Sequence, residues 1–315
     1  MSPKTVANKV VYIALVVNLA IALIKFIAAA ITGSSAMVSE GVHSLVDTIN
    51  EILLLYGIKR AAKPPDPQRP FGYGRELYFW SFIVALLVFA LGAGVSLYEG
   101  ITHLLNPERI ERPLINYIVL GASFVCEAVS WGVSLKAFRQ TKGDQGYFDA
   151  FRASKDPGNF MVLFEDTAAL LGLIIAAAGI TAALVFDMPR LDGVASIGIS
   201  LVLGAASFLM ARETKALLIG EGAQPHVRES ILSIAGADGD VLTVNAVLTV
   251  QMGPNQIIAA LSAEFYDALS TTQIEQCVSR IEAKIKLAHP DVTTLFIKPQ
   301  TAETWRRRNS HSASL

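Results

Sequence analysis

Ionisable side chains occur inside two long apolar segments of the chain. His43 and Asp47 lie four residues apart, so a helix would place both on one face. A second apolar segment contains the adjacent carboxylates Glu165 and Asp166. One imidazole with two or three carboxylates suits Zn²⁺, or more loosely Mn²⁺, Fe²⁺ or Co²⁺. The pattern predicts a metal site, and polar contacts that merely join two helices are the alternative.

Long apolar helices must position these groups. Of 315 residues, 52% are hydrophobic and 17% charged, whereas a soluble domain carries about 25% charged residues. This composition disfavours a soluble enzyme and a disordered chain, and a net charge of −1 provides no general attraction to nucleic acid. Six stretches are near or above the ~20 residues that cross a bilayer as a helix. They are Val10–Ile31, Ala36–Tyr56, Leu77–His103, Pro113–Phe138, Phe160–Phe186 and Leu191–Met210.

Lysine and arginine are distributed unevenly between the two sides of such a bundle. The N-terminus and the connections at 57–76 and 136–155 are rich in both, whereas the opposite connections contain only Arg109, Arg112 and Arg190. Positive residues favour the cytoplasmic side, so we expect both termini to be cytoplasmic. We therefore expect a multi-pass integral membrane protein, located in the cytoplasmic (inner) membrane if the source is a bacterium.

After about residue 213 the composition becomes that of a soluble domain. The patterns predict a helix at His226–Ile234, strands at Val241–Gln251 and Ile257–Phe265, a helix opened by the capping box Thr272-Gln-Ile-Glu275, and a last strand at Val292–Ile297. The order α-β-β-α-β indicates a small α+β layer sandwich. We expect a transmembrane domain at 1–213, a cytoplasmic domain at 214–300 and a disordered tail at 301–315.

Several motifs resemble those of one transporter family. Ile31-Thr-Gly-Ser-Ser-Ala-Met, running into Glu40-Gly-Val-His43-Ser-Leu-Val-Asp47-Thr-Ile-Asn50-Glu51, is similar to the first two spans of the cation diffusion facilitator family. Pro70-Phe-Gly-Tyr-Gly-Arg-Glu76 and Leu163-Phe-Glu-Asp166 support the resemblance by their order. It implies a bundle of six transmembrane helices, a ferredoxin-like (metallochaperone-like) cytoplasmic domain, and a homodimer that exchanges a divalent metal, usually zinc, for protons.

The resemblance also assigns individual residues. His43 and Asp47 match the two ligands of the second span, and Asp166 matches a ligand of the fifth. The family often has His or Asp four residues before that last position, where this chain has Val162, which cannot bind a metal. The chain thus departs from the four-ligand pattern. It resembles the subgroup that has a glutamate directly before this aspartate, which is Glu165 here.

The fourth ligand and two further charges stay open at this point. Glu165 is a candidate, although it lies ~100° around the helix from Asp166. Water or Asn50 is the alternative. Lys25 in the first span and Glu127 in the fourth could form an interhelical ion pair, since either charge alone would be costly. A role of the two in a proton relay is the other interpretation.

Two auxiliary metal positions of the family are altered. Arg69 and Tyr73 stand where some members have histidines, which leaves Asp66 alone in that loop. Lys298 takes the place of a His-x-Asp ligand pair in the C-terminal domain. A lysine repels cations, so we expect no dinuclear site there.

These observations predict efflux of a divalent metal, Zn²⁺ before Mn²⁺, Fe²⁺ or Co²⁺, in exchange for protons, because ligands must lose protons to bind metal. We expect a secondary transporter and not an enzyme, without a prosthetic group, and with lipid, metal, protons and a second copy as partners. Nucleic acid is not an expected partner. A non-transporting scaffold and an intramembrane metal-dependent hydrolase are the alternatives.

Overall fold

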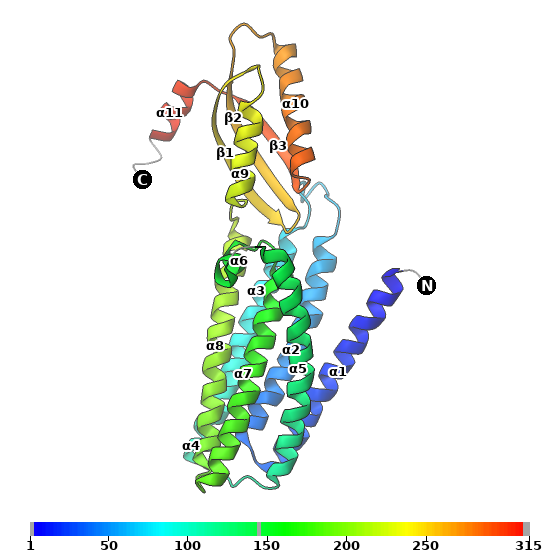
Figure 1. Ribbon diagram of the computed structural model, residues 1–315, viewed down its shortest axis with the longest axis vertical. Helices are drawn as coiled ribbons and strands as arrows, with labels where there is room; N and C mark the ends of the chain where they lie inside the picture. Colours follow the sequence, from blue (N-terminus) through cyan, green and yellow to red (C-terminus); the bar gives the residue numbers. More distant parts are fainter. Residues whose placement is uncertain (1–2, 144–145, 311–315) are drawn as a thin grey trace. The chain divides into compact units, whose positions relative to one another are not determined.

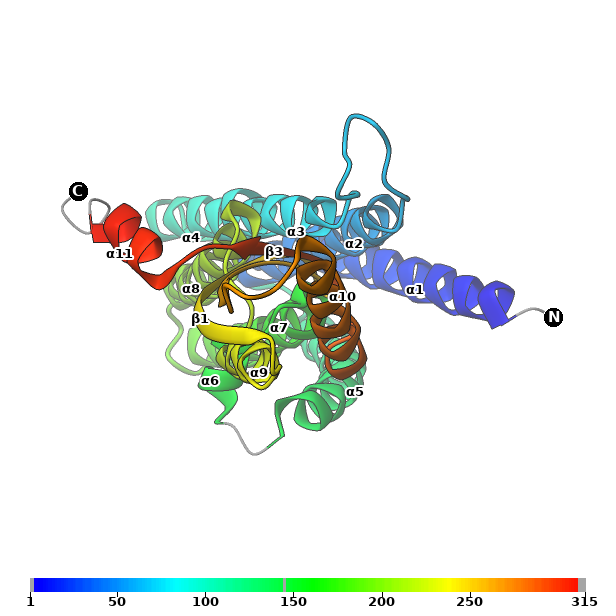
Figure 2. The same cartoon turned by 90° about the horizontal axis from the view of Figure 1, so that it is seen from above.

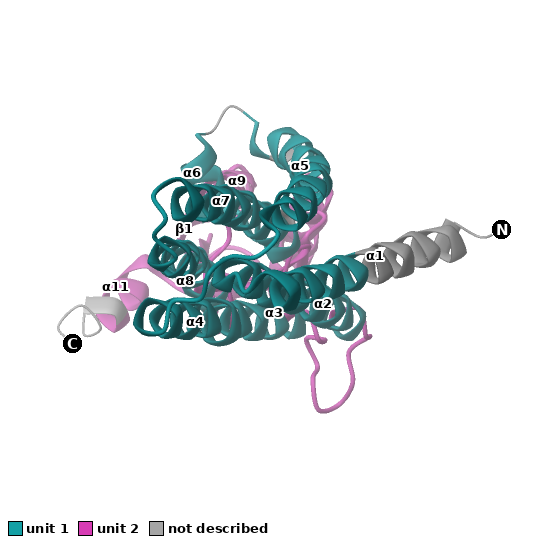
Figure 3. Ribbon diagram, turned by 90° about the horizontal axis from the view of Figure 1, so that it is seen from below, with its two compact units in different colours: residues 1–60, 76–215 teal, residues 61–75, 216–315 magenta. Residues whose placement is uncertain are grey.

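The computed structural model describes the backbone of residues 3–143 and 146–310, and the side chains of 18–140, 142–143, 146–158 and 160–308. The chain divides into two compact units (Figure 3). Unit 1 contains the described residues up to Arg60 together with Glu76–Lys215, and unit 2 contains Ala61–Arg75 with the described residues from Ala216 onward. The connection Ala61–Arg75 therefore belongs to unit 2, where Gln256 Nε2 donates to the Phe71 carbonyl at 2.6 Å.

Helices, most of them long, make up most of unit 1 (Figure 1). They are α1 Pro3–Thr32, α2 Ser35–Ala61, α3 Arg75–Leu87, α4 Gly94–Leu105, α5 Pro113–Lys142, the short α6 Tyr147–Ala153, α7 Pro157–Val185 and α8 Arg190–Ile219. A π-helical segment, η1 Val88–Ala93, joins α3 to α4. The Ala93 carbonyl at the end of this segment accepts a hydrogen bond from Ser200 Oγ of α8 at 2.8 Å. Such π-helical turns often mark functional regions of a helix.

Four described helical stretches are long and apolar enough to cross a membrane. They are Arg75–Leu105, Pro113–Gln140, Phe160–Val185 and Arg190–Ile219. In α1 the comparable part is the shorter apolar stretch Asn18–Thr32, because the residues before it lack described side chains. Helix α2 has 27 residues, but its several polar and charged residues lower its hydropathy. The sequence predicts six spans, and α1 and α2 are the two that are absent from these four described stretches.

The beginning of α2 is fixed to α8 by a buried carboxylate. Asp192 is fully buried, and its Oδ1 accepts a hydrogen bond from Ser34 Oγ at 2.9 Å. Its Oδ2 accepts from the backbone amides of Ser35 at 2.6 Å and Ala36 at 3.3 Å. The first amides of a helix have no partner within the helix, and an acidic group also complements the positive end of the helix dipole. Asp192 therefore caps α2 from another helix.

Unit 2 is a three-stranded sheet with helices (Figures 1 and 2). Its elements are α9 Pro225–Gly236, β1 Val241–Gly253, β2 Gln256–Phe265, α10 Thr271–Ala288, β3 Val292–Pro299 and α11 Ala302–Ser310. Strand β2 lies centrally, antiparallel to β1 and parallel to β3. Ile231 of α9, Ile281 of α10 and Leu261 of β2 are buried in one core, so α9 and α10 cover the same face of the sheet. The predicted order α-β-β-α-β is confirmed up to β3.

Two predictions for this region differ in detail from the structure. The capping box of α10 is formed by Ser270 and Gln273 and not by Thr272 and Glu275, because the helix begins two residues earlier. The expected tail contains α11. Thr301 Oγ1 accepts from the Thr304 amide at 3.2 Å at its start, which provides the N-terminal cap that a short helix needs. Residues 311–315 of the expected tail lie outside the described residues.

Candidate metal centre

The imidazole and carboxylate of α2 lie together as their spacing predicts. His43 Nδ1 lies 3.4 Å from Asp47 Oδ1, and the two side chains are 1% and 22% exposed. Neither nitrogen of His43 has a hydrogen-bond partner in the described part of the chain. A buried polar atom without a partner costs about 1–3 kcal/mol. An incoming cation or proton would remove that cost, which makes this pair a candidate binding group.

The two carboxylates of α7 are each held by a neighbouring helix. Glu165 Oε1 accepts from Asn50 Nδ2 of α2 at 3.1 Å. Asp166 Oδ2 accepts from two α5 hydroxyls, Ser130 Oγ at 2.9 Å and Ser134 Oγ at 3.2 Å. Serines one turn apart on α5 thus fix one oxygen of Asp166. Asn50, the alternative ligand, donates to Glu165 through Nδ2, whereas its Oδ1 has no hydrogen-bond partner among the described residues.

A cavity of about 500 Å³ collects most of the predicted site residues. It lies between α1, α2, α5 and α7, with Val84 of α3 also in its wall. We name it the central cavity. Five carboxylates line it: Asp47, Glu51, Glu127, Glu165 and Asp166. His43 is not among the lining residues, and Val162 is. The predicted residues therefore share one polar space, with His43 reaching it through its contact with Asp47.

The ligand atoms in this cavity do not form a closed coordination shell. Among the described residues, no three of His43, Asp47, Glu165 and Asp166 bring ligand atoms within 4.8 Å of one another. Zinc binds nitrogen and oxygen at about 2.0–2.2 Å, so its ligands must approach each other more closely. Rotation of side chains on α2 and α7 would be needed to bind one ion with three or more of them.

Of the two interpretations of Lys25 and Glu127, an ion pair between them is not formed in the described part of the chain. Lys25 Nζ instead binds Glu40 Oε2 at 3.0 Å and Ser44 Oγ at 2.8 Å, both on α2. Lys25 is 1% exposed and Glu40 is 0% exposed, so this is a fully buried ion pair between α1 and α2. Glu127 lines the central cavity. Glu40 lies within the motif that begins the second predicted span, and a carboxylate within an apolar span is a signal of a specific role.

The loop before α3 holds Asp66 in a compact turn. Asp66 Oδ1 accepts from the backbone amides of Gln68 at 3.0 Å and Arg69 at 2.7 Å, and Oδ2 accepts from the Tyr73 hydroxyl. These hydrogen bonds, that of Tyr73 foremost, lower the pKa of the Asp66 carboxyl. Tyr73 and Arg69 thus engage this carboxylate from the positions where some family members have histidines.

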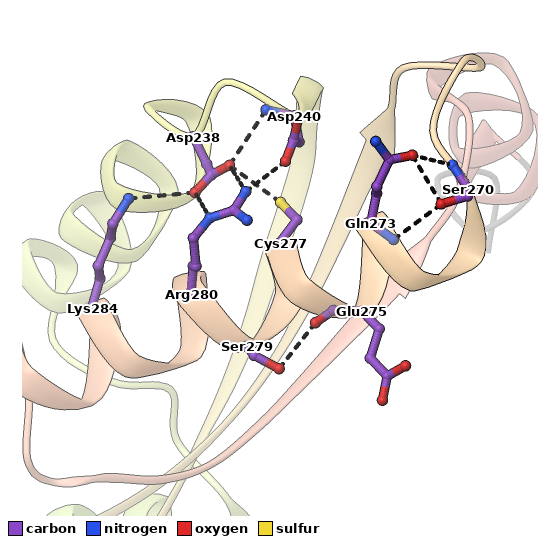
Figure 4. Close-up of polar contacts among 9 residues, drawn as sticks. All are labelled: Asp238, Asp240, Ser270, Gln273, Glu275, Cys277, Ser279, Arg280 and Lys284. Carbon is purple, nitrogen blue, oxygen red and sulfur yellow. Dashed lines mark hydrogen bonds and ion pairs between the residues drawn. The ribbon is translucent and has the colours of Figure 1, made fainter.

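A cluster in unit 2 brings three ligand-type atoms within 4.8 Å of one another: those of Asp238, Asp240 and Cys277 (Figure 4). Arg280 already supplies the positive charge that a metal would bring to this cluster, since its Nη2 lies 2.9 Å from Asp238 Oδ1 and 2.6 Å from Asp240 Oδ2. Lys284 adds a second cation at 3.4 Å from Asp238. These bonds, chiefly with Arg280, lower the pKa of Asp238.

The Cys277 thiol in this cluster acts as a donor, to Asp238 Oδ1 at 3.3 Å. Burial, followed by this contact with Asp238, raises its pKa to about 11. The thiolate is the form that binds metals, so a raised pKa opposes ligation. We interpret the cluster as an ion pair that joins the α9–β1 turn to α10.

Comparison with known proteins places the helical part of the chain in one family. Residues 11–219 match the family described as the cation efflux transmembrane domain. The chain is similar to the mitochondrial proton-coupled zinc antiporter SLC30A9 of Xenopus laevis, with 35% identity over 261 residues, which are 82% of this chain and 46% of that protein.

Two more distant relatives extend the comparison. Metal tolerance protein C4 of Arabidopsis thaliana is 28% identical over 225 residues, or 71% of this chain and 49% of that protein. The cation-efflux pump FieF of Cronobacter sakazakii is 24% identical over 269 residues, or 85% and 84%. The chain thus spans about half the length of the first two relatives and most of the length of the third.

Proposed function

Because the chain belongs to the cation diffusion facilitator (cation efflux) family of membrane transporters, we propose that it exports a divalent metal cation, Zn²⁺ before others, in exchange for protons. The relatives are named as an antiporter, a tolerance protein and a pump, so the hydrolase alternative is not retained. The observation that carries the proposal is the central cavity, which collects five carboxylates between apolar helices. Such a concentration of acidic groups inside a membrane bundle is stable only with compensating cations or protons.

The proposal includes a membrane arrangement. We propose that α1 and α2 cross the membrane together with the four apolar stretches, which gives six spans. The transmembrane domain would comprise 1–213, except that the connection Ala61–Arg75 groups with unit 2. The cytoplasmic domain would comprise 214–300 and the terminal segment 301–315. Both termini would be cytoplasmic, in a bacterial inner membrane or in an organelle membrane of equivalent orientation. A homodimer is proposed from family membership.

His43, Asp47 and Asp166 are the proposed ligands, and Glu165 is the proposed fourth. Their ligand atoms would approach one another when the cation enters the central cavity. Each ligand must give up its proton to bind, so loading the cation releases protons and reprotonation on the far side releases the cation. Access from alternating sides requires relative motion of the helices, as in other secondary transporters. No nucleotide is required.

Transport by the full chain in sealed proteoliposomes tests the proposal. A Zn²⁺ gradient should drive proton flux. Asp47→Asn or Asp166→Asn should reduce that flux at least about tenfold, because even the loss of a residue that only hydrogen-bonds to a metal ligand can cost that much. Glu51→Gln is the matched control, because Glu51 lines the same cavity but bonds to Asn18 at 3.3 Å outside the proposed ligand set. Its flux should be close to that of the unaltered chain.

Glu165→Gln decides the fourth ligand, since a flux equal to that of the control would remove Glu165 from the set. The scaffold alternative is favoured by the open arrangement of the ligand atoms and by Val162. It predicts no metal-driven flux from the unaltered chain at all. Unchanged flux in both aspartate variants would refute the proposed site while leaving transport itself intact.

A further inference from the structure

A second cavity lies at the end of unit 1 where α1 ends and α2 begins. Its volume is about 480 Å³, and it is lined by the α1–α2 turn, by α4 and by the segment that follows α4. We name it the far-end cavity. Glu99 and His103 line it from α4, four residues apart and therefore on one helix face. Glu108 lines it from the segment after α4. None of these residues belongs to the proposed central site.

His103 is a buried imidazole with an unused nitrogen. It is 7% exposed, and Nε2 has no hydrogen-bond partner in the described part of the chain. The nearest acidic atom, Asp192 Oδ2, lies 3.9 Å away. That oxygen already accepts from the amides of Ser35 and Ala36, so it is committed to capping α2. A buried nitrogen left in this condition favours a ligand that can supply the missing interaction.

A close helix crossing fixes the position of His103. Gly100 of α4 and Gly193 of α8 lie at this crossing, where a Cβ on Gly193 would meet the Gly100 carbonyl oxygen at 2.9 Å and His103 Cβ at 3.3 Å. Small residues allow this approach of the two backbones. His103 is therefore held between α4 and α8 at the wall of the cavity, and a site built on it is rigid on that side.

The charges around the far-end cavity favour a cation. Neither Glu99 nor Glu108 forms an ion pair with any residue that the structure describes. The Glu108 carboxylate lies against the α1–α2 turn, 3.6 Å from the place of a Cβ on Gly33. Arg109 is next in sequence, but its guanidinium is 82% exposed and lies 3.9 Å from Asp187, which does not line the cavity. Among the described residues, Glu99, His103 and Glu108 line the cavity and no lysine or arginine does. Their ligand atoms do not all lie within 4.8 Å of one another, so side chains would have to rotate to bind one ion, as in the central cavity.

We propose that Glu99, His103 and Glu108 form a second divalent-cation site in the far-end cavity. Imidazole and carboxylate together are the donors that Zn²⁺ and related ions accept. The site rests on the proposed function, because it would receive the ion after the ion leaves the central cavity and before it enters the compartment beyond. An ion held there would no longer be in contact with the central carboxylates, which could then take up protons.

Zinc binding to the purified full chain in detergent tests this site, with Zn²⁺ titrated against a chromophoric chelator. The unaltered chain should bind two Zn²⁺, and Glu99→Gln with His103→Asn should remove one of them. Asp47→Asn should remove the other, because it alters the central site. Glu111→Gln is the matched control: Glu111 is exposed at the same end and does not line the far-end cavity. It should leave both ions bound.

Each result separates the second site from the proposed function. If the double variant binds Zn²⁺ as the Glu111 control does, the far-end site is refuted, and the effect of Asp47→Asn on flux still decides the transport mechanism. If Asp47→Asn leaves flux unchanged while the double variant loses an ion, the central site is refuted and the far-end site stands. If the double variant does not purify as a folded protein, Glu99→Gln alone serves, since Glu99 is only half-buried. It should weaken binding of the second ion at least about tenfold, and an unchanged affinity refutes the proposal.

Discussion

Replacing Lys25 by methionine should strongly destabilise the helical unit. Lys25 and Glu40 are both essentially inaccessible to solvent, and their charged atoms lie 3.0 Å apart. Methionine has a similar length but no charge, so the variant leaves the Glu40 carboxylate buried without its cation. Removing one member of a buried ion pair typically costs about 3–5 kcal/mol. Glu40 Oε1 already has no hydrogen-bond partner among the described residues, so no second donor is in place to compensate.

A double-mutant cycle with Glu40→Gln tests whether the two charges depend on each other. Glu40→Gln in the Lys25→Met background removes the unpaired charge, so the double variant should recover most of the lost stability. Ser44→Ala is the control, because it removes only the hydroxyl that Lys25 Nζ contacts at 2.8 Å. It should cost about 1.5–3 kcal/mol at most, the range for a hydrogen bond to a charged group.

Unfolding in mixed micelles of increasing SDS content measures these free energies on the full chain. The expected result is a coupling energy of several kcal/mol between positions 25 and 40. If the free energies of unfolding lost in Lys25→Met alone and in Glu40→Gln alone add up to the loss in the double variant, the two charges do not depend on each other. That outcome would refute the assignment of Glu40 as the partner of Lys25.

Two further predictions concern other contacts of the chain. Arg280→Gln should lower the stability of unit 2 at pH 7, because the pKa of Asp238 is lowered in the folded state, chiefly by Arg280. The stabilisation from a lowered pKa is present above the ordinary aspartate value of about 3.9 and is lost as the pH falls through the native pKa. Thermal unfolding at pH 7 and at pH values below 4 should therefore show a difference from the unaltered chain that shrinks below about pH 4. A constant difference would contradict this reasoning. Gly100→Ala should destabilise unit 1 by about 1–3 kcal/mol, because the new Cβ would lie 2.7 Å from Ile197 Cγ1 and 2.8 Å from the Gly193 carbonyl oxygen. Gly94→Ala is its control, since the nearest atom there is the Phe89 carbonyl oxygen at 3.8 Å. Equal stability of the two variants in the micelle assay would exclude a tight crossing of α4 and α8.

Features that depend on spacing along one helix could be predicted from the sequence. His43 and Asp47 contact each other because four residues make about one helical turn. The partner of Lys25 could not be predicted in this way, because it depends on which helix lies against α1 and at what height. Glu40 and Glu127 are equivalent candidates by composition, and the packing of α1 against α2 selects Glu40. The ligand role of the central residues stays a prediction.

Local patterns also left choices that the sequence alone does not resolve. Ser270 with Gln273 and Thr272 with Glu275 both fit the capping-box pattern, and only the first residue of α10 decides between them. The π-helical segment Val88–Ala93 has no periodicity that distinguishes it from the helix around it. The burial of His103 cannot be predicted from the sequence, because it depends on a crossing with Gly193 of α8, which is about ninety residues distant.

The cap that Asp192 provides limits how the bundle can move. Three hydrogen bonds join this one side chain to Ser34, Ser35 and Ala36, and all of them are shielded from water. Sliding α8 along α2 would break these three hydrogen bonds together and leave a carboxylate and two amides without partners in an apolar interior. We therefore expect the starts of α2 and α8 to move together. A transport cycle would therefore have to open the bundle at contacts other than this one.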